Sequence, residues 1–394
     1  MIQLQTELLA GRDALLAATD SWNDLWERSY ARQSTVRAEG IAAWLKHFAD
    51  GREFVGVCVH DEDRLIAALP LVVDRSVGFL RTYKLPVNCW GNAADLLIDR
   101  DVDIQSATAA LVGAMQSLPS GIFSFEEISL GAPQWREFRQ VLQDQRGRSY
   151  ATALSPVGVI DIRGNWEAYE KSWSGNHRGA VKRKLRKLEK QGELRLERHR
   201  TNDEQLQRLL RVAFEIEDRS WKGSEGTSVL KVPGVFDYIL DEARAVAQRG
   251  SLDVWFLYLN DQPIAFEYCH FARGTCFSHK IGYDPDFSKY GPGRLLRYLQ
   301  LQEYHDDPDC QLFDMLGTLC HSKAKWATRT YESGRLIGSA GHPLTNAIIS
   351  GYAWAAPKLR AIRGTTAEEA PKLGAESYLA NSEAAEEAAV LEVL

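Results

Sequence analysis

The 394-residue sequence has few cysteines and no long apolar run. Its six cysteines include no CxxC pair and are too few in so long a chain for a disulfide framework, so we expect reduced thiols. Apolar stretches such as 66–73 are far shorter than the ~20 residues of a membrane helix, and the N-terminus lacks a basic and then apolar leader. We therefore expect a cytoplasmic protein without membrane insertion.

Several catalytic motifs are also missing. The sequence contains no HExxH, no GxSxG and no glycine loop followed by GKS or GKT, which argues against zinc hydrolase, serine hydrolase and P-loop chemistry. We expect no metal site. A DNA-binding protein is not expected either, because one basic segment is too little to hold a duplex.

Charge is distributed unevenly along the chain. The net charge of -6 equals that of the last 31 residues, 364–394, which hold seven Glu and one Lys, so the preceding body is neutral. Within that body, 178–200 carries ten Lys or Arg against three Glu, which makes an anionic ligand possible there. The Ala- and Glu-rich segment 364–394 has few large apolar residues, and we expect it to be a disordered tail.

Hydrophobic periodicity predicts the same order of elements twice. In the first half we expect helices at 21–31, 38–48, 103–118 and 134–145, with strands at 53–60, 64–73, 79–85 and 123–130. In the second half we expect helices at 166–173, 178–191, 203–219, 234–249 and 293–304, with strands at 193–199, 252–259, 263–272, 275–283 and 311–316. The sequence thus predicts an α/β protein with two domains, 1–152 and 153–363, each with a mixed, mostly antiparallel sheet flanked by helices.

A glycine turn follows the last strand of the second predicted hairpin. Tyr290-Gly291-Pro292-Gly293 opens the helix at 293–304, where free N–H groups and glycine backbone suit a phosphate. Lys289 and Arg294 flank the turn and add positive charge. We predict that Lys289, Tyr290, Gly291, Gly293 and Arg294 bind an anionic cofactor group; a well-capped helix start without a ligand is the alternative.

Three antiparallel strands, a glycine turn, a helix and another strand resemble the GNAT N-acyltransferase fold. That resemblance implies that an acyl-CoA, most simply acetyl-CoA, places its pyrophosphate on this turn. The family pattern there begins with Gln or Arg, whereas this sequence has Ser288.

Residues 165–330 further resemble the acetyltransferase domain of the cellulose-biosynthesis (CelD-type) family, distant relatives of the FemABX peptidyltransferases. The resemblance rests on the basic helix from Arg178, on Glu217-x-x-x-Trp221-Lys222-Gly223, on Gly282-Tyr283-Asp284-Pro285, on the glycine turn, and on Phe313-Asp314-Met315-Leu316-Gly317 followed by Lys323 and Trp326. The family's usual Tyr before that Lys is replaced. The resemblance implies a bacterial-type enzyme of cellulose or exopolysaccharide synthesis, with Trp221, Lys222, Asp284, Asp314 and Lys323 near the acceptor, and a degenerate first copy. We also expect His279 and Lys280 of the hairpin to bind the substrate; a histidine packed within the strand is the alternative for His279.

Two carboxylates compete as the general base. A two-residue turn at 273–274 predicts Glu267 opposite Lys280 and Tyr268 opposite His279, which places a charge pair inside apolar strands. Glu267 is then either a structural partner of Lys280 or a base beside the thioester. Glu217, one helical turn from Trp221 and Lys222, is either a solvated helix end or the base.

These observations favour an acyl-CoA-dependent N- or O-acyltransferase that acts on a sugar, a polysaccharide precursor or a related amine or hydroxyl acceptor. Two alternatives stay open. A FemABX-like aminoacyl or peptidyl transferase could use the basic helix for tRNA phosphates, and a non-catalytic scaffold could keep the GNAT fold without turnover.

Overall fold

The computed structural model describes residues 4–77, 80–201 and 204–362. The predicted tail at 364–394 lies outside these residues. Within the described part of the chain, no helix is both long enough and apolar enough to cross a membrane.

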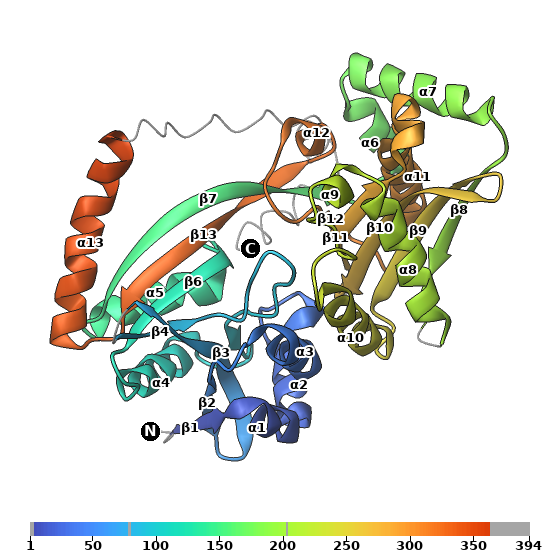
Figure 1. Ribbon diagram of the computed structural model, residues 1–394. Helices are drawn as coiled ribbons and strands as arrows, with labels where there is room; N and C mark the ends of the chain where they lie inside the picture. The colour runs from blue at the N-terminus through green and yellow to red at the C-terminus, as the bar shows by residue number, and fades with distance from the viewer. Residues whose placement is uncertain (1–3, 78–79, 202–203, 363–394) are drawn as a thin grey trace.

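One mixed sheet runs through the whole molecule (Figure 1). Its strand order is β1-β2-β3-β4-β6-β13-β7-β12-β11-β10-β9-β8, and the short β5 pairs with β3. The strands of the first half are β1 (Gln5–Ala10), β2 (Phe54–Asp61), β3 (Arg64–Val77), β4 (Leu80–Lys84), β5 (Leu97–Ile98), β6 (Ile122–Ser129) and β7 (Arg148–Asp161). Those of the second half are β8 (Leu194–His199), β9 (Leu252–Leu259), β10 (Gln262–Ala272), β11 (Thr275–Tyr283), β12 (Leu312–Asp314) and β13 (Arg329–Ser339).

The two halves repeat one pairing scheme. In each, four consecutive neighbours pair antiparallel, β1 to β4 in the first half and β8 to β11 in the second. The fourth strand then pairs parallel with the next one, β4 with β6 and β11 with β12. A parallel pair needs a crossover, which α4 (Ile104–Gln116) and α11 (Pro292–Asp306) provide. The predicted repetition of elements is therefore present as a repeated topology.

The last strands of the two halves are exchanged. β13 pairs antiparallel with both β6 and β7, while β7 pairs antiparallel with β12. Long strands β7 and β13 thus run side by side across the molecule and connect its two ends (Figure 1). The expected domain boundary at 152/153 falls within β7, and two separable domains remain a prediction.

Helices cover both faces of the sheet and share cores between the halves. The remaining helices are α1 (Gly11–Ala17), α2 (Thr19–Arg28), α3 (Ala38–Phe48), α5 (Pro133–Asp144), α6 (Trp166–Ser172), α7 (Gly175–Glu189), α8 (Gln205–Asp218), α9 (Trp221–Ser224), α10 (Val235–Ala247), α12 (His321–Ala324) and α13 (Pro343–Ile362), with 3₁₀ turns η1 (Ser34–Val36) and η2 (Pro285–Tyr290). One hydrophobic cluster joins α2 and α3 of the first half to α8 and α10 of the second. A separate cluster lies under α7 and α11.

Elements with clear periodicity lie close to their predicted positions. The predicted helix 38–48 matches α3, and the strands at 252–259 and 275–283 match β9 and β11. The predicted helix 21–31 is wrong at its end, because the chain becomes extended at Ser29, whose hydroxyl donates to the Trp26 carbonyl (3.0 Å). The sequence reasoning missed β1, α1, β7, β13 and α13.

Candidate active site

A β-bulge interrupts β11 where it meets β10. Tyr268 pairs with Lys280 and Cys269 pairs with Ser278, so His279 is an extra residue on β11. A bulge leaves its extra residue outside the regular ladder and changes the direction of nearby side chains. The predicted register is therefore wrong on the far side of this bulge: Glu267 lies opposite Ile281 rather than Lys280, and Tyr268 lies opposite Lys280 rather than His279.

The bulge lies where β11 and β12 separate. Their parallel pairing covers only Thr275 to Phe277 against Leu312 to Asp314. Beyond it a cavity of about 440 Å³ opens, which we call the Lys280 cavity. His279 and Lys280 line it from β11, and Leu316 and Gly317 line it from the end of β12. Its other lining residues are Gln33, Asn88, Cys89, Trp90, Gly91, Asn92, Glu127, Leu154, Ser155, Val157, Thr318, Tyr331 and Ser333. Its volume suits a small-molecule ligand.

Two cavity residues adopt the left-handed backbone conformation although they are not glycine. Leu316 has φ +43° and Glu127 has φ +57°. On β6, Ile128 pairs with Gly334 and Phe125 with Leu336, so two residues oppose one and Glu127 lies in a second bulge. Such strain costs of order 1–3 kcal/mol and concentrates at functional sites. Our sequence reasoning missed Glu127; two adjacent Glu in an otherwise apolar strand were the available signal.

Burial changes the protonation of the cavity groups. Desolvation lowers the pKa of His279 to about 3, with a further contribution from Lys280. Burial also lowers the pKa of Lys280, although the nearby carboxylates of Glu217 and Glu242 oppose the change. Burial and the neighbouring Glu126 raise the pKa of Glu127. The cavity thus presents a neutral imidazole and a carboxylate that binds protons more readily than an exposed one.

A chain of buried polar groups extends from the cavity wall into the protein. The His279 ring lies 4.0 Å from that of His270, whose Nε2 is 2.8 Å from the Tyr268 hydroxyl. Tyr268 and Tyr238 donate hydrogen bonds to the two carboxylate oxygens of Glu242 (3.2 and 2.6 Å). This chain of hydrogen bonds positions His270, whose ring in turn packs against the His279 ring.

The glycine turn lies on the α7–α11 side of the sheet. Gly291 caps α11 with φ +68°, and a Cβ at this position would lie 2.9 Å from the Nζ atom of Lys184. A Cβ at Gly293 would make only ordinary contacts with Tyr283 and Ile281, at 3.6 and 3.9 Å. Gly291 is therefore required by the backbone, whereas the position of Gly293 could accept a Cβ without a clash.

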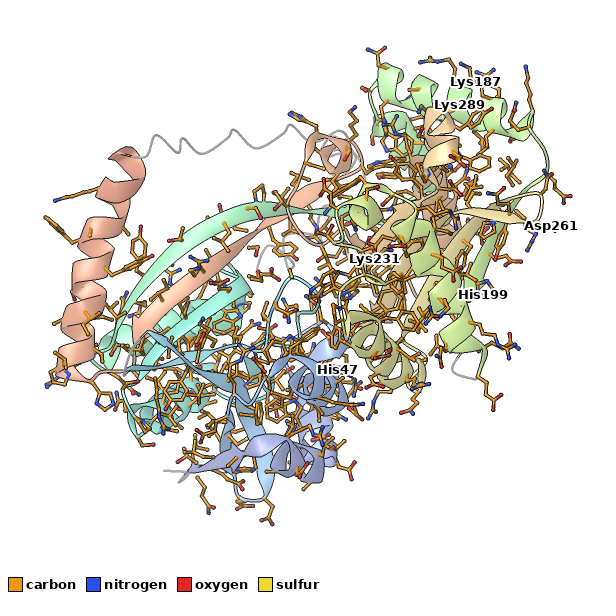
Figure 2. All side chains as sticks on the ribbon, viewed as in Figure 1. His47, Lys187, His199, Lys231, Asp261 and Lys289 are labelled. Atoms are coloured by element: carbon orange, nitrogen blue, oxygen red, sulfur yellow. The ribbon has the colours of Figure 1, made fainter. Side chains whose placement is uncertain are left out.

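Positive charge surrounds this turn. Lys184 on α7 donates to the Lys289 carbonyl (3.4 Å), and Lys187 and Lys289 lie at the same end of the molecule in Figure 2. Burial and the positive charges of Arg294 and Lys187 lower the pKa of Lys184. Like charges raise the free energy of such a cluster, and an anion would relieve the repulsion. The turn therefore has the backbone and the charge that a pyrophosphate needs.

Comparison with known proteins adds to this geometry. The sequence model of the acetyltransferase (GNAT) domain family matches residues 175–324, which are less than half of the chain. Residues 175–324 are thus similar to a GNAT-type acetyltransferase domain. The bulge, β12 and the glycine turn all lie within these residues. No curated protein matches the sequence significantly.

Solved structures show the same fold at low sequence identity. FemX is 12% identical with a TM-score of 0.56, covering 81% of this chain and 95% of its own. A protein of unknown function from Bacteroides thetaiotaomicron is 11% identical with a TM-score of 0.53, covering 82% and 97%. A more distant match, with a TM-score of 0.47, is a tandem GNAT protein from the clavulanic acid biosynthesis pathway, at 11% identity and coverages of 86% and 99%. The chain thus has an α/β fold with a large mixed sheet, as predicted.

Glu217 is not a solvated helix end. It is 2% exposed at the end of α8, where it pairs with Lys222 (2.6 Å) and accepts a hydrogen bond from the Val229 N–H (3.0 Å). Its charge acts on Lys280, yet it does not line the Lys280 cavity. Trp221, its predicted companion, is 63% exposed on α9.

Glu267 lies on the opposite face of the sheet from His279. It is fully buried, forms an ion pair with Arg297 of α11, and accepts a hydrogen bond from Ser278. Its predicted partnership with Lys280 is wrong, because the bulge shifts the register and α11 supplies the partner instead. Its role as a base stays a prediction.

The other predicted site residues are divided among three places. Asp284 caps η2 through the Asp286 N–H (3.1 Å) and pairs with Arg219 (3.0 Å). Lys323 donates to the Leu316 carbonyl, next to the Lys280 cavity. Asp314 accepts a hydrogen bond from the Leu316 N–H (2.9 Å) and lines a second cavity, which also lies between the halves.

Proposed function

We propose that the protein transfers an acyl group, most simply acetyl, from acyl-CoA to an amine or hydroxyl of a sugar or polysaccharide precursor. The supporting observation is that the bulge and a glycine turn surrounded by positive charge both lie within the residues similar to a GNAT domain, and that His279 and Lys280 at the bulge line a cavity. In this proposal Lys289, Tyr290, Gly291, Gly293 and Arg294 hold the CoA phosphates.

The chemistry of the Lys280 cavity fits an acceptor with little net charge. Glu127 and Lys280 are the charged residues among those that line it, since His279 is neutral above its pKa of about 3. The remaining polar groups are amides, hydroxyls, the neutral imidazole of His279 and the Cys89 thiol, together with the ring of Trp90. Amides, hydroxyls and an aromatic ring suit a hydroxyl-rich molecule better than an anion. The link to cellulose or exopolysaccharide synthesis rests on family resemblance alone.

Transfer requires that the acceptor attacks the thioester carbonyl, that the C–S bond breaks, and that the acceptor proton leaves. In our proposal Glu127 takes that proton, because it lines the cavity whereas Glu217 and Glu267 do not. CoA leaves as a thiol after the proton is passed on. Holding the two reactants together supplies up to ~7–11 kcal/mol, and a general base adds ~10² to 10⁴ in rate.

Calorimetry with acetyl-CoA tests the cofactor assignment. The Gly293→Asp variant places a carboxylate next to the phosphates without a steric clash at its Cβ, and we expect at least a tenfold loss of affinity from charge repulsion. Gly351→Asp on α13 is the control, because an added Cβ is tolerated at both positions: it would meet nothing within 4 Å at Gly351 and only ordinary contacts at Gly293. Equal binding by Gly293→Asp and wild type would show that the turn does not hold CoA.

A second candidate is an aminoacyl or peptidyl transferase. The fold shared with FemX and the exposed basic residues Arg183, Arg186 and Lys187 on α7 favour it. Binding of an aminoacyl-tRNA with micromolar or tighter affinity, together with no affinity for acetyl-CoA, would select this candidate.

A further inference from the structure

Lys280 differs from the other partly buried lysines of the described chain. Each of the others donates to an oxygen atom: Lys84 to Asp74, Lys222 to Glu217, and Lys184 and Lys323 to the backbone carbonyls of Lys289 and Leu316. Within residues 4–77, 80–201 and 204–362, Lys280 has no hydrogen bond and no ion pair, and its Nζ atom lies 5.1 Å from the centroid of the Trp90 ring. A partly buried polar group without a partner is uncommon, so its position needs an explanation.

The amine of Lys280 can be reached from the Lys280 cavity. Lys280 lines this cavity, and its Nζ atom keeps accessible surface. In contrast, the unpaired Nε2 atom of His279 is almost completely covered. A small electrophile in the cavity can therefore contact the Lys280 amine directly.

The surroundings of Lys280 favour its free amine. Burial lowers the pKa of Lys280, and the carboxylates of Glu217 and Glu242 oppose this change without cancelling it. A desolvated lysine with a lowered pKa has a larger share of free amine, which is its nucleophilic form. Glu127 lines the same cavity, and the positive charge of Lys280 acts on its carboxylate. A carboxylate in this position can remove a proton from the amine, directly or through one water.

The proposed acyl donor lies next to the strand that carries Lys280. A Cβ at Gly293 in the glycine turn would lie 3.9 Å from Ile281, the residue after Lys280 on β11. Beyond Phe277, β12 no longer pairs with β11, and residues after the paired parts of both strands line the cavity. The long, flexible pantetheine arm of a CoA on the turn can therefore carry its thioester past the end of β12 into the cavity.

We propose that Lys280 accepts an acyl group from acyl-CoA, so that the protein acylates itself inside its own cavity. The inference rests on the proposed function, because acyl-CoA on the glycine turn is the donor. Glu127 takes one proton from the Lys280 ammonium group, and the free Nζ atom attacks the thioester carbonyl. The C–S bond breaks and an amide forms at Nζ, while the second proton that the nitrogen loses leaves with CoA as its thiol. The neutral amide removes the positive charge and fills part of the cavity.

Peptide mass spectrometry of the full chain after incubation with acetyl-CoA tests the inference. We expect Lys280 to be acetylated at least about tenfold faster than Lys358, an exposed lysine on α13, because burial holds more of Lys280 as the free amine. Glu127→Gln should slow the acetylation of Lys280 by ~10². Glu126→Gln, with a carboxylate that does not line the cavity, should react like wild type.

A second comparison shows whether the donor acts from the glycine turn. At an acetyl-CoA concentration below the wild-type Kd, Gly293→Asp should acetylate Lys280 about tenfold more slowly, in proportion to its weaker binding of the donor. Gly351→Asp should react like wild type. Melting curves of each variant show that it is folded at the assay temperature.

The possible outcomes separate this inference from the proposed function. If acetyl-CoA binds but Lys280 reacts no faster than Lys358, self-acylation is overturned and the proposed function stands. Equal rates for wild type and Gly293→Asp mean that the donor attacks from solution, which also overturns self-acylation. Absence of acetyl-CoA binding by calorimetry overturns the proposed function, and this inference with it.

Discussion

Glu127 combines a strained backbone with a place in the wall of the Lys280 cavity. A non-glycine residue at φ +57° lowers the stability of the protein. In this bulge, the strained conformation accompanies a glutamate that lines the Lys280 cavity. Its neighbour Glu126 pairs with Arg335 (2.9 Å) and does not line the cavity. Two adjacent residues of one type therefore have different environments, which makes them a matched pair for mutation.

We predict that Glu127→Gln lowers kcat by ~10² or more, whereas Glu126→Gln changes it less than twofold. The assay measures thiol release from acetyl-CoA with glucosamine as the acceptor, with melting curves for each variant. The acid limb of the pH–rate profile should disappear only in Glu127→Gln. Should Glu217→Gln lose turnover instead while Glu127→Gln keeps it, the base is Glu217 and our proposal for Glu127 fails.

Glu267 is expected to matter for stability. Glu267→Gln leaves the buried guanidinium of Arg297 without its counter-charge, and loss of one partner of such a pair costs roughly 3 kcal/mol. Urea denaturation should show this loss, while calorimetry should show little change in acetyl-CoA affinity. Full stability combined with a large fall in kcat would instead support Glu267 as a base.

At the scale of elements, the β10–β11 pair carries a pH-sensitive contact. His270 and His279 lie with their rings 4.0 Å apart, near Lys280 and Glu242, and burial lowers the pKa of both histidines. A histidine with a lowered pKa in the folded state stabilises the protein above its unfolded pKa of about 6.5. That contribution is lost as the pH falls towards the folded value, about 3 for His279.

We therefore predict that the urea midpoint falls as the pH is lowered from 6.5 to 3, and that His279→Gln reduces this dependence. His321→Gln is the control, because His321 is exposed at the start of α12 and away from the pair. If the urea midpoints of wild type and His279→Gln fall in parallel with pH, burial of His279 does not cause the pH dependence of stability.

How far sequence could predict each element depended on local signals. Strands β9 and β11 and helix α3 have strong periodicity and turn residues at their ends, so their limits were predicted closely. Strands β7 and β13 have little alternation, and their pairing is fixed by residues more than a hundred positions away. The bulge at His279 has no signature in the letters of the hairpin, so a register based on turn length alone placed Glu267 against the wrong residue.

In the candidate site, too, residues with a local sequence signal were predicted and residues brought in by distant contacts were missed. The glycine turn, His279 and Lys280 were predicted, because glycines and charges inside apolar strands are visible locally. Glu127, Gln33 and Gln134 were missed, because they belong to the first half, and the contact of that half with the second is not visible in any local pattern. Reading the first half as degenerate hid its contribution to both cavity walls.

At the scale of the whole molecule, the exchanged strands connect the two halves, and we predict that the halves fold together. A fragment 1–152 ends inside β7, and a fragment 153–363 has β13 without its partner β6. We predict that neither fragment alone shows a cooperative thermal transition by circular dichroism, and that co-expression of both restores a folded complex. A monomeric, cooperatively melting 153–363 fragment would contradict this and support two separable domains.

The position of β13 also constrains how the protein is made. β13 lies between β6 and β7 in the sheet, yet it is the last described strand to be synthesised. While the ribosome translates the intervening residues, β6 and β7 each have an open hydrogen-bonding edge, and open edges are templates for aggregation. The nascent chain is therefore most prone to aggregation in the long interval before residue 339 leaves the ribosome. Only then can β13 pair with β6 and β7 and complete the centre of the sheet.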